Sequence, residues 1–251
     1  MPEAVATIEG WYALHDFRRV DWERWHATPK DIRAALLEDL VQWTTAWEQK
    51  NQGRQAGFGS YQMLGHKADL LFLYFAPRLE DLAEAEAHFR SAAWAGLLAP
   101  VWSYLSVVEL SQYLAKGESA ENSPYLQGRL YPSVPQTRYL VFYPMSKRRQ
   151  ANDNWYMLSA DERRELMQDH GLIGHRHRSQ VTQIITGSQG LDDWEWGVTL
   201  FADDAVAFKK IVYEMRFDEA TARFGEFGPF YTGIRLDSGA VEHWFVPPAM
   251  I

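Results

Sequence analysis

The chain contains no cysteine among its 251 residues. This absence excludes disulfide bonds, thiolate catalysis, cysteine-ligated iron–sulfur clusters and thiolate-ligated haem. The sequence also lacks an apolar run of membrane-spanning length, and its first residues contain no basic segment followed by an apolar core. We therefore expect a soluble, cytoplasmic protein with no membrane partner.

Positive charge is also scarce, because 25 Lys and Arg residues stand against 33 Asp and Glu residues and give a net charge of -8. A general nucleic-acid binder needs a surplus of basic residues on its binding face, so this function is not expected. Basic residues do gather in the middle of the chain, at Arg129, Lys147, Arg148, Arg149, Arg176 and Arg178. A basic pocket for a small polyanion and an ordinary solvated face both remain open.

Aromatic side chains, in contrast, are abundant: the chain has 11 Trp, 12 Tyr and 13 Phe residues. Such a composition suits a large core, an interface or a flat apolar ligand. Ordinary core packing is expected to account for most of these rings.

Hydrophobic periodicity predicts the same order of elements twice, strand-helix-strand-strand-helix-strand. The first set is expected at 6–16, 31–49, 59–76 (a hairpin), 79–95 and 101–109. The second set is expected at 137–144, 160–170, 181–186, 194–201, 205–217 and 230–236. The similar runs Leu73–Ala76 and Thr199–Ala202 support an internal duplication. The predicted class is therefore α+β, with two split βαβ units that each have an antiparallel sheet and helices on one face.

The two halves are expected to meet in a connecting loop. Residues 115–136 contain several Gly and Pro residues, which favour a loop. The predicted organisation is an N-terminal half at 1–114, this loop, and a C-terminal half at 137–251. Arg129 lies in the loop, where a surface charge and a clamp for a carboxylate are both open interpretations.

Most of the candidate chemistry lies between Tyr143 and Gln183. A phenol at Tyr143, an imidazole at His170 and an amide at Gln183 suggest a bound reactive centre. The helix between them is predicted to start after Ser159, which forms a capping box with the carboxylate three residues later, and to end at His170 before a glycine.

His170 has two interpretations. Leu166 and Met167 precede it by four and three residues, so we expect these three side chains to share a buried helix face. An imidazole against an apolar wall suits a haem-type iron, although a helix-terminal His often only complements the helix dipole. The nearby His175 and His177 give weak support for zinc, and we expect both to be solvated.

Five runs of sequence, taken together, resemble the coproheme decarboxylases of the chlorite dismutase family. They occur in the family's order, and the resemblance covers essentially the whole chain. The runs are Tyr143–Arg149, Asp169–Gly174, Trp194–Gly197, Tyr213–Asp218 and Ala222–Tyr231.

The resemblance implies two ferredoxin-like repeats that form a dimeric α+β barrel within one subunit, usually assembled as a homopentamer, with a tetrapyrrole bound in the C-terminal half. It implies that His170 is the proximal iron ligand and that Tyr143 is a redox-active tyrosine. Lys147 and Arg129 correspond to groups that hold propionates, with Lys147 beside the reacting carboxylate. The resemblance also implies that Met145 lines the pocket and that Thr221 contacts a propionate. Gln183 corresponds to the distal position at which chlorite dismutases carry arginine, which argues against chlorite chemistry.

The implied reaction uses hydrogen peroxide to convert two propionates of iron coproporphyrin III (coproheme) into vinyl groups, which gives haem b. The substrate's own iron supplies the redox chemistry. A ferrochelatase that delivers the substrate is an implied transient partner. Two alternatives remain open: a chlorite-degrading or peroxidase enzyme that uses the same pocket, and a non-enzymatic haem carrier that needs only His170 and apolar walls.

Overall fold

The computed structural model describes residues 3–4, 6–111 and 123–246. These residues form two compact units. The N-terminal unit contains 11–105, 131–134 and 233–246, and the C-terminal unit contains most of the rest, chiefly 135–232. Each unit therefore takes short segments from the other half of the chain.

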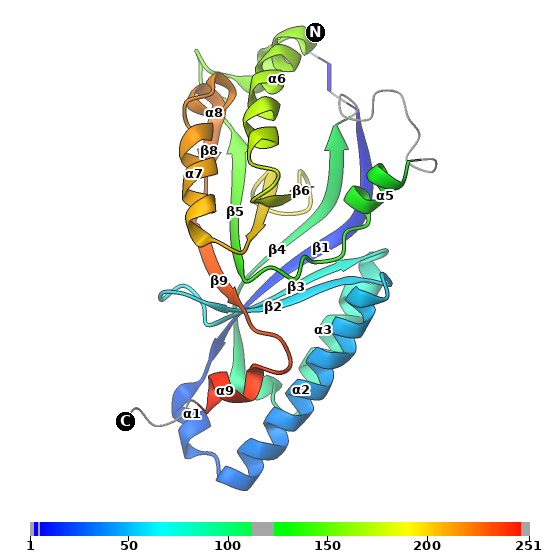
Figure 1. The fold of residues 1–251 in the computed structure, drawn as a ribbon, viewed down its shortest axis with the longest axis vertical. Helices are drawn as coiled ribbons and strands as arrows, with labels where there is room; N and C mark the ends of the chain where they lie inside the picture. Colours follow the sequence, from blue (N-terminus) through cyan, green and yellow to red (C-terminus); the bar gives the residue numbers. More distant parts are fainter. Residues whose placement is uncertain (1–2, 5, 112–122, 247–251) are drawn as a thin grey trace. The chain divides into compact units, whose positions relative to one another are not determined.

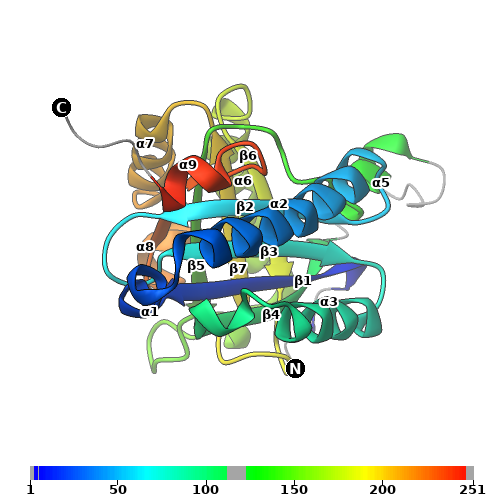
Figure 2. The ribbon, with the colours of Figure 1, turned by 90° about the horizontal axis from the view of Figure 1, so that it is seen from below.

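The N-terminal unit is an antiparallel sheet in the order β4-β1-β3-β2 with helices packed on one face (Figures 1 and 2). Its elements are β1 (Thr7–Val20), α1 (Trp22–Ala27), α2 (Lys30–Gln52), β2 (Gly57–Met63), β3 (Leu70–Ala76), α3 (Leu79–Ser91), β4 (Leu98–Ser111) and α9 (Val241–Phe245). The hairpin predicted at 59–76 is confirmed, with β2 and β3 paired so that Tyr61 lies opposite Leu71. Its core is one large apolar cluster between the sheet and helices α2 and α3.

The C-terminal unit repeats this order of strands as β9-β5-β7-β6. Its elements are α5 (Pro124–Leu130), β5 (Tyr139–Lys147), α6 (Ala160–Arg176), β6 (Thr182–Gly187), β7 (Trp196–Ala202), α7 (Ala205–Met215), α8 (Glu219–Phe224), β8 (Gly225–Phe227) and β9 (Tyr231–Arg235). The end of β4 adds to this sheet, because Val107 pairs with Gly187 on β6. The predicted duplication and the α+β class are thus confirmed.

Part of the predicted connecting loop is a helix. Residues 115–122 lie outside the described residues, but Pro124–Leu130 form α5, so the loop prediction was wrong there. Pro124 occupies the first helical position, where the missing N–H costs nothing. Leu126 and Leu130 then bury against Leu110, and this tertiary contact stabilises a helix that composition alone does not suggest.

Helix α6 starts where the sequence predicts and ends later. Ser159 Oγ accepts the Glu162 N–H at 3.3 Å, and Glu162 Oε2 accepts the Ser159 N–H at 2.8 Å, which confirms the capping box. The predicted end at His170 was wrong, because the helix continues to Arg176. Gly171 is an ordinary helical residue here, and the burial of Ile173 holds the additional turns against the protein.

Candidate functional site

Four of the predicted site residues lie on one face of the C-terminal sheet. The register pairs Tyr143 with Val198 and Val198 with Ile185, so these three side chains share a face. Met145 and Lys147 follow Tyr143 at intervals of two, and Gln183 precedes Ile185 by two, so they point to the same side. Helix α7 packs on this face around Val198 and Leu200.

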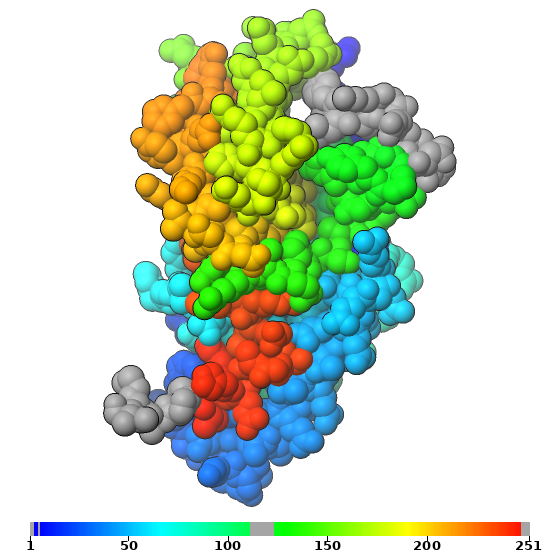
Figure 3. All heavy atoms as spheres, viewed as in Figure 1, coloured from blue at the N-terminus to red at the C-terminus, as the bar shows by residue number. Residues whose placement is uncertain are grey.

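The part of this face around β6 is incompletely covered. Met145, Gln183, Ile185 and Trp196 are only half-buried, although three of them are apolar or aromatic. Helix α6 packs chiefly on α7 and α8, and Figure 3 shows α6 and α7 side by side. Gln183 extends toward α6, since its Nε2 lies 3.4 Å from the position that a Cβ on Gly174 would take. This half-covered apolar surface is suited to a flat ligand.

His170 is oriented by a buried carboxylate. Its Nδ1 lies 3.1 Å from Oδ2 of Asp218 and 3.3 Å from the hydroxyl of Thr221. The imidazole side chain is 29% exposed and that of Asp218 is 2% exposed. A carboxylate that accepts the Nδ1 proton fixes the tautomer in which Nε2 carries the lone pair needed by a metal. Within the described residues, no group of three or more His, Cys, Asp and Glu side chains forms a further metal cluster.

Asp218 is fixed by the start of the next helix. It is the N-cap of α8, where its Oδ1 accepts the Thr221 N–H at 2.9 Å and its Oδ2 accepts the Thr221 hydroxyl at 2.8 Å. Burial by itself would raise the pKa of Asp218, but the hydrogen bonds from His170 and Thr221 outweigh it and hold the pKa below its usual value. Asp218 is therefore an anion at neutral pH. The Thr221 hydroxyl is engaged in this network, and the expected contact with a propionate stays a prediction.

Lys147 is buried at the end of β5. Its Nζ donates to the carbonyl of Ala220 at 3.3 Å and lies 4.3 Å from the ring centre of Trp155. Burial lowers the pKa of Lys147 to about 8, although Asp218 and Glu195 act in the opposite direction. A lysine with such a pKa can both pair with a carboxylate and release a proton near neutral pH.

Tyr143 lies in an aromatic environment. Its ring stacks on Phe230, with centroids 4.4 Å apart, and lies near Phe227. Only 5% of the residue is exposed. Burial raises the pKa of Tyr143 well above its ordinary value, and the charge of Arg216 offsets this only in part. The phenol is therefore protonated over the whole physiological range.

Two expectations about neighbouring side chains need correction. Met167 is 37% exposed, so it does not belong to the buried face of α6, whereas Leu166 packs against the cluster of Trp155 and its neighbours. The buried residues of α6 are instead Arg163 and Ile173, which stand seven residues before and three residues after His170. His177 is not solvated: its Nε2 lies 2.6 Å from Glu214 on α7 and ties the two helices together. His175 is exposed, as expected.

Arg129 is not brought into the His170 group. It lies on α5 and is partly exposed, and its guanidinium donates to the hydroxyl of Tyr125 on the same helix at 3.2 Å. Its expected role at a propionate therefore stays a prediction.

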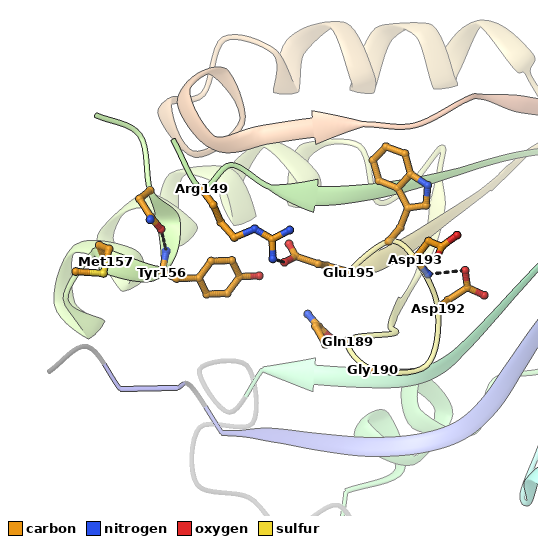
Figure 4. Close-up of a pocket in the computed structure, with 10 residues that line it drawn as sticks. Arg149, Tyr156, Met157, Gln189, Gly190, Asp192, Asp193 and Glu195 are labelled. Atoms are coloured by element: carbon orange, nitrogen blue, oxygen red, sulfur yellow. Dashed lines mark hydrogen bonds and ion pairs between the residues drawn. The ribbon is translucent and has the colours of Figure 1, made fainter. Parts of the chain in front are cut away.

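A hollow of about 480 Å³ lies next to this site (Figure 4). Its wall includes Tyr156, Trp194 and Glu195 and does not include the predicted site residues themselves. Glu195 is buried and joins the two places, because it accepts the backbone N–H of Lys147 at 2.7 Å and pairs with Arg149 at 3.2 Å.

Sequence reasoning missed the roles of Asp218 and Glu195. Asp218 stands 48 residues from His170, so only the folded structure brings the two together. A local signal did exist, since Asp218 followed by Thr221 has the spacing of a helix N-cap. Glu195 had no comparable signal.

Comparison with known proteins identifies the fold and the family. The family model described as chlorite dismutase matches residues 33–236. Coproheme decarboxylases from two strains of Thermus thermophilus are each 50% identical over 242 residues, which is 96% of this chain and 96% of theirs. No helix in the described ranges is long and apolar enough to cross a membrane.

Solved structures agree with this result. A structure described as a novel heme-binding protein from Thermus thermophilus is similar with a TM-score of 0.92 and 50% identity, and the match covers 98% of both chains. A chlorite dismutase from Candidatus Nitrospira defluvii, in complex with imidazole, has a TM-score of 0.75 over 94% of this chain and 95% of its own. Its identity of 19% shows a common fold alone. With a family model matched over most of its length, the chain belongs to the chlorite dismutase family.

Proposed function

We propose that the protein is a coproheme decarboxylase, which uses hydrogen peroxide to convert two propionates of iron coproporphyrin III to vinyl groups and so makes haem b. Each propionate carboxylate, with one hydrogen peroxide and one proton, yields a vinyl group, one carbon dioxide and two waters. The Thermus relatives named as coproheme decarboxylases, with 50% identity along almost the full length, support this substrate. The iron of the substrate supplies the redox chemistry.

One observation carries the proposal: the hydrogen bond from Nδ1 of His170 to the buried Asp218, which leaves Nε2 available for the iron. Among proteins that bind metals through histidine, this carboxylate–histidine pair is the usual way to orient the ring and raise its basicity. A carrier would also need this pair. The additional groups on the same sheet face are what favour an enzyme.

The half-covered surface of Met145, Ile185 and Trp196 is the proposed platform for the macrocycle, with α6 on the other side of it. Apolar contacts with the porphyrin ring would complete the burial of these side chains. Gln183 would lie on the face opposite His170 and hold the oxidant through its amide, with no positive charge to favour chlorite.

Tyr143 and Lys147 are the proposed reactive residues. The neutral phenol of Tyr143 gives up a proton and passes an electron to the substrate that hydrogen peroxide has oxidised, and the phenoxyl then removes a hydrogen atom from the β-carbon of a propionate. The propionate loses a second electron to the same oxidised substrate and releases carbon dioxide, which leaves the vinyl group. The ammonium of Lys147 pairs with the carboxylate of that propionate and, with its pKa of about 8, can also pass a proton. Arg129 is proposed to bind an intact propionate. Thr221 is proposed to hold Asp218 in place behind His170 and also to contact a propionate.

The remaining parts of the proposal concern assembly and surroundings. Family membership supports a homopentamer, a cytoplasmic location and a transient contact with the ferrochelatase that inserts iron into coproporphyrin. Light scattering of the purified protein tests the pentamer directly, since a monomer or dimer would reject it.

The decisive experiment mixes the purified protein with iron coproporphyrin III, titrates hydrogen peroxide and follows porphyrins by chromatography and mass spectrometry. We expect stepwise conversion through a three-propionate intermediate to haem b. Tight binding without conversion would reject the decarboxylase and leave the carrier, and oxygen release from added chlorite would favour the chlorite-degrading alternative.

A further inference from the structure

We propose that Glu109 on β4 is a further catalytic residue, which accepts a proton from hydrogen peroxide and returns it when the O–O bond breaks. This inference rests on the proposed function, because it concerns activation of the oxidant at the same site.

Glu109 lies on the sheet face that carries Tyr143 and Gln183. Val107 pairs with Gly187 on β6, and Gly187 pairs with Trp196 on β7. Glu109 follows Val107 by two residues and therefore points to the same side of the sheet. This side is the half-covered surface on which the macrocycle is proposed to bind.

A hydrogen bond holds one oxygen of the carboxylate, and the other oxygen lies against Gly187. The indole Nε1 of Trp196 donates to Oε1 of Glu109 at 2.8 Å. The other oxygen, Oε2, occupies space that a Cβ on Gly187 would need. A side chain at 187 would displace the carboxylate from this position. The side chain is partly exposed, which allows a small oxidant to reach it.

The surroundings also tune Glu109 for proton transfer. Burial raises the pKa of Glu109, the hydrogen bond from Trp196 lowers it, and the negative charge of Glu9 on β1 raises it again, with a net rise. Glu9 is the charged group that faces Glu109 from the adjoining strand, and Trp196 on β7 is neutral. A carboxylate with a raised pKa accepts a proton more readily at neutral pH than an ordinary glutamate does.

The other residues on this face are less suited to the task. The amide of Gln183 binds an oxidant but does not exchange protons, and Lys147 is engaged with Ala220 and Trp155. Glu109 accepts one proton of hydrogen peroxide and leaves the hydroperoxide anion for the ferric substrate. The same proton then returns to the outer oxygen, which departs as water, and the carboxylate is regenerated. The inner oxygen and the oxidising equivalents stay with the substrate.

The test uses Glu109→Gln, which keeps the shape of the side chain and an oxygen that accepts the Trp196 N–H. Conversion of coproheme is measured with hydrogen peroxide and, separately, with peracetic acid, a stronger acid that needs less help to lose its proton. With hydrogen peroxide we expect the rate to fall about 100-fold. With peracetic acid we expect a much smaller loss, and coproheme affinity should remain within about twofold.

Equal losses with both oxidants, or no loss with either, would overturn the role of Glu109. Failure of the parent protein with both oxidants would instead reject the proposed function. Glu84→Gln on the exposed surface of α3 is the matched control and should leave both rates unchanged.

A second variant, Glu9→Gln, tests the role of Glu109 even if Glu109→Gln folds poorly. Glu9→Gln removes the like charge, so the pKa of Glu109 should fall and the acid limb of the peroxide-dependent rate should move to lower pH. An acid limb that stays in place or moves to higher pH contradicts the proposal.

Discussion

The first helices of the two units, α2 and α6, occupy equivalent places in the repeated topology but meet their sheets differently. Helix α2 buries five residues, among them Leu37, Leu40 and Trp47, and packs on β2. Helix α6 buries only Arg163 and Ile173, and it packs on α7 and α8. The same fold therefore closes one sheet with a core and leaves the other with room for a ligand.

Aromatic residues make the contrast concrete. In the N-terminal unit, the ring of Trp43 lies edge-on to Phe58, Phe72 and Phe89 at centroid distances of 5.7, 5.3 and 5.8 Å, so rings fill the space under α2. On α6, His170 is instead oriented by Asp218. One copy of a duplicated unit can thus have a packed aromatic core where the other copy has a binding site, while both keep the same strand order.

The largest effect is expected from a comparison of two tyrosine variants, one in each unit. Tyr143→Phe removes the phenolic hydrogen but keeps the ring that stacks on Phe230, so we expect decarboxylation to fall by at least about 100-fold with substrate affinity preserved. Tyr74→Phe in the buried core of the N-terminal unit is the control, and its turnover should match the parent. Rates of haem b formation measure both, and equal rates for Tyr143→Phe and the parent would remove the radical role.

The second test concerns packing. Leu40→Ala leaves a cavity under α2 and should lower the free energy of unfolding by about 2–5 kcal/mol. Met167→Ala on the exposed side of α6 should change it by less than about 0.5 kcal/mol in the ligand-free protein. Denaturant titration of both variants gives the comparison. A similar loss for both would mean that α6 is packed as firmly as α2.

A third test addresses the carboxylate behind His170. Asp218→Asn keeps the size of the side chain but removes the anion that holds the Nδ1 proton, so we expect affinity for iron coproporphyrin to fall about 10- to 100-fold. Metal-free coproporphyrin is the control ligand, because its binding does not use His170. Should both porphyrins lose affinity equally, the residue acts through the fold and not through the iron.

The smallest effect expected is a dependence of substrate affinity on pH. The pKa of Lys147 is lowered to about 8, so its ammonium is present below that pH and is lost as pH rises through it. Affinity for the tetracarboxylate substrate should therefore be highest below pH 8 and weaken by up to about tenfold above it. A bound carboxylate shifts this transition upward. In Lys147→Met the decline between pH 7 and 9 should disappear, and a persistent decline would point to another group.

Local patterns predicted the parts of the fold that depend on near neighbours. The capping box at Ser159 located the start of α6, and the two strand-like runs that contain Tyr61 and Leu71 located the hairpin. The same reasoning failed at Gly171, because a glycine adopts the helical conformation as readily as the left-handed one, and only the burial of Ile173 decides between them.

The site was predictable only in part for a similar reason. Motifs pointed to Tyr143, His170 and Gln183, but a common face for Tyr143 and Gln183 depends on the register of three strands. Asp218 and Glu109 act through contacts with residues 48 and 87 positions away, which no spacing in the sequence reveals.

The two oxygens of Asp218 link the stability of a short helix to the orientation of the imidazole. Oδ1 starts the six-residue helix α8, and Oδ2 orients His170. Fraying of that short helix would release the imidazole at the same moment, and the colour of a bound porphyrin would change with it. The absorbance of the bound porphyrin, followed during gentle heating, would then report the local unfolding of α8. This change should occur at temperatures below those at which the remainder of the protein unfolds.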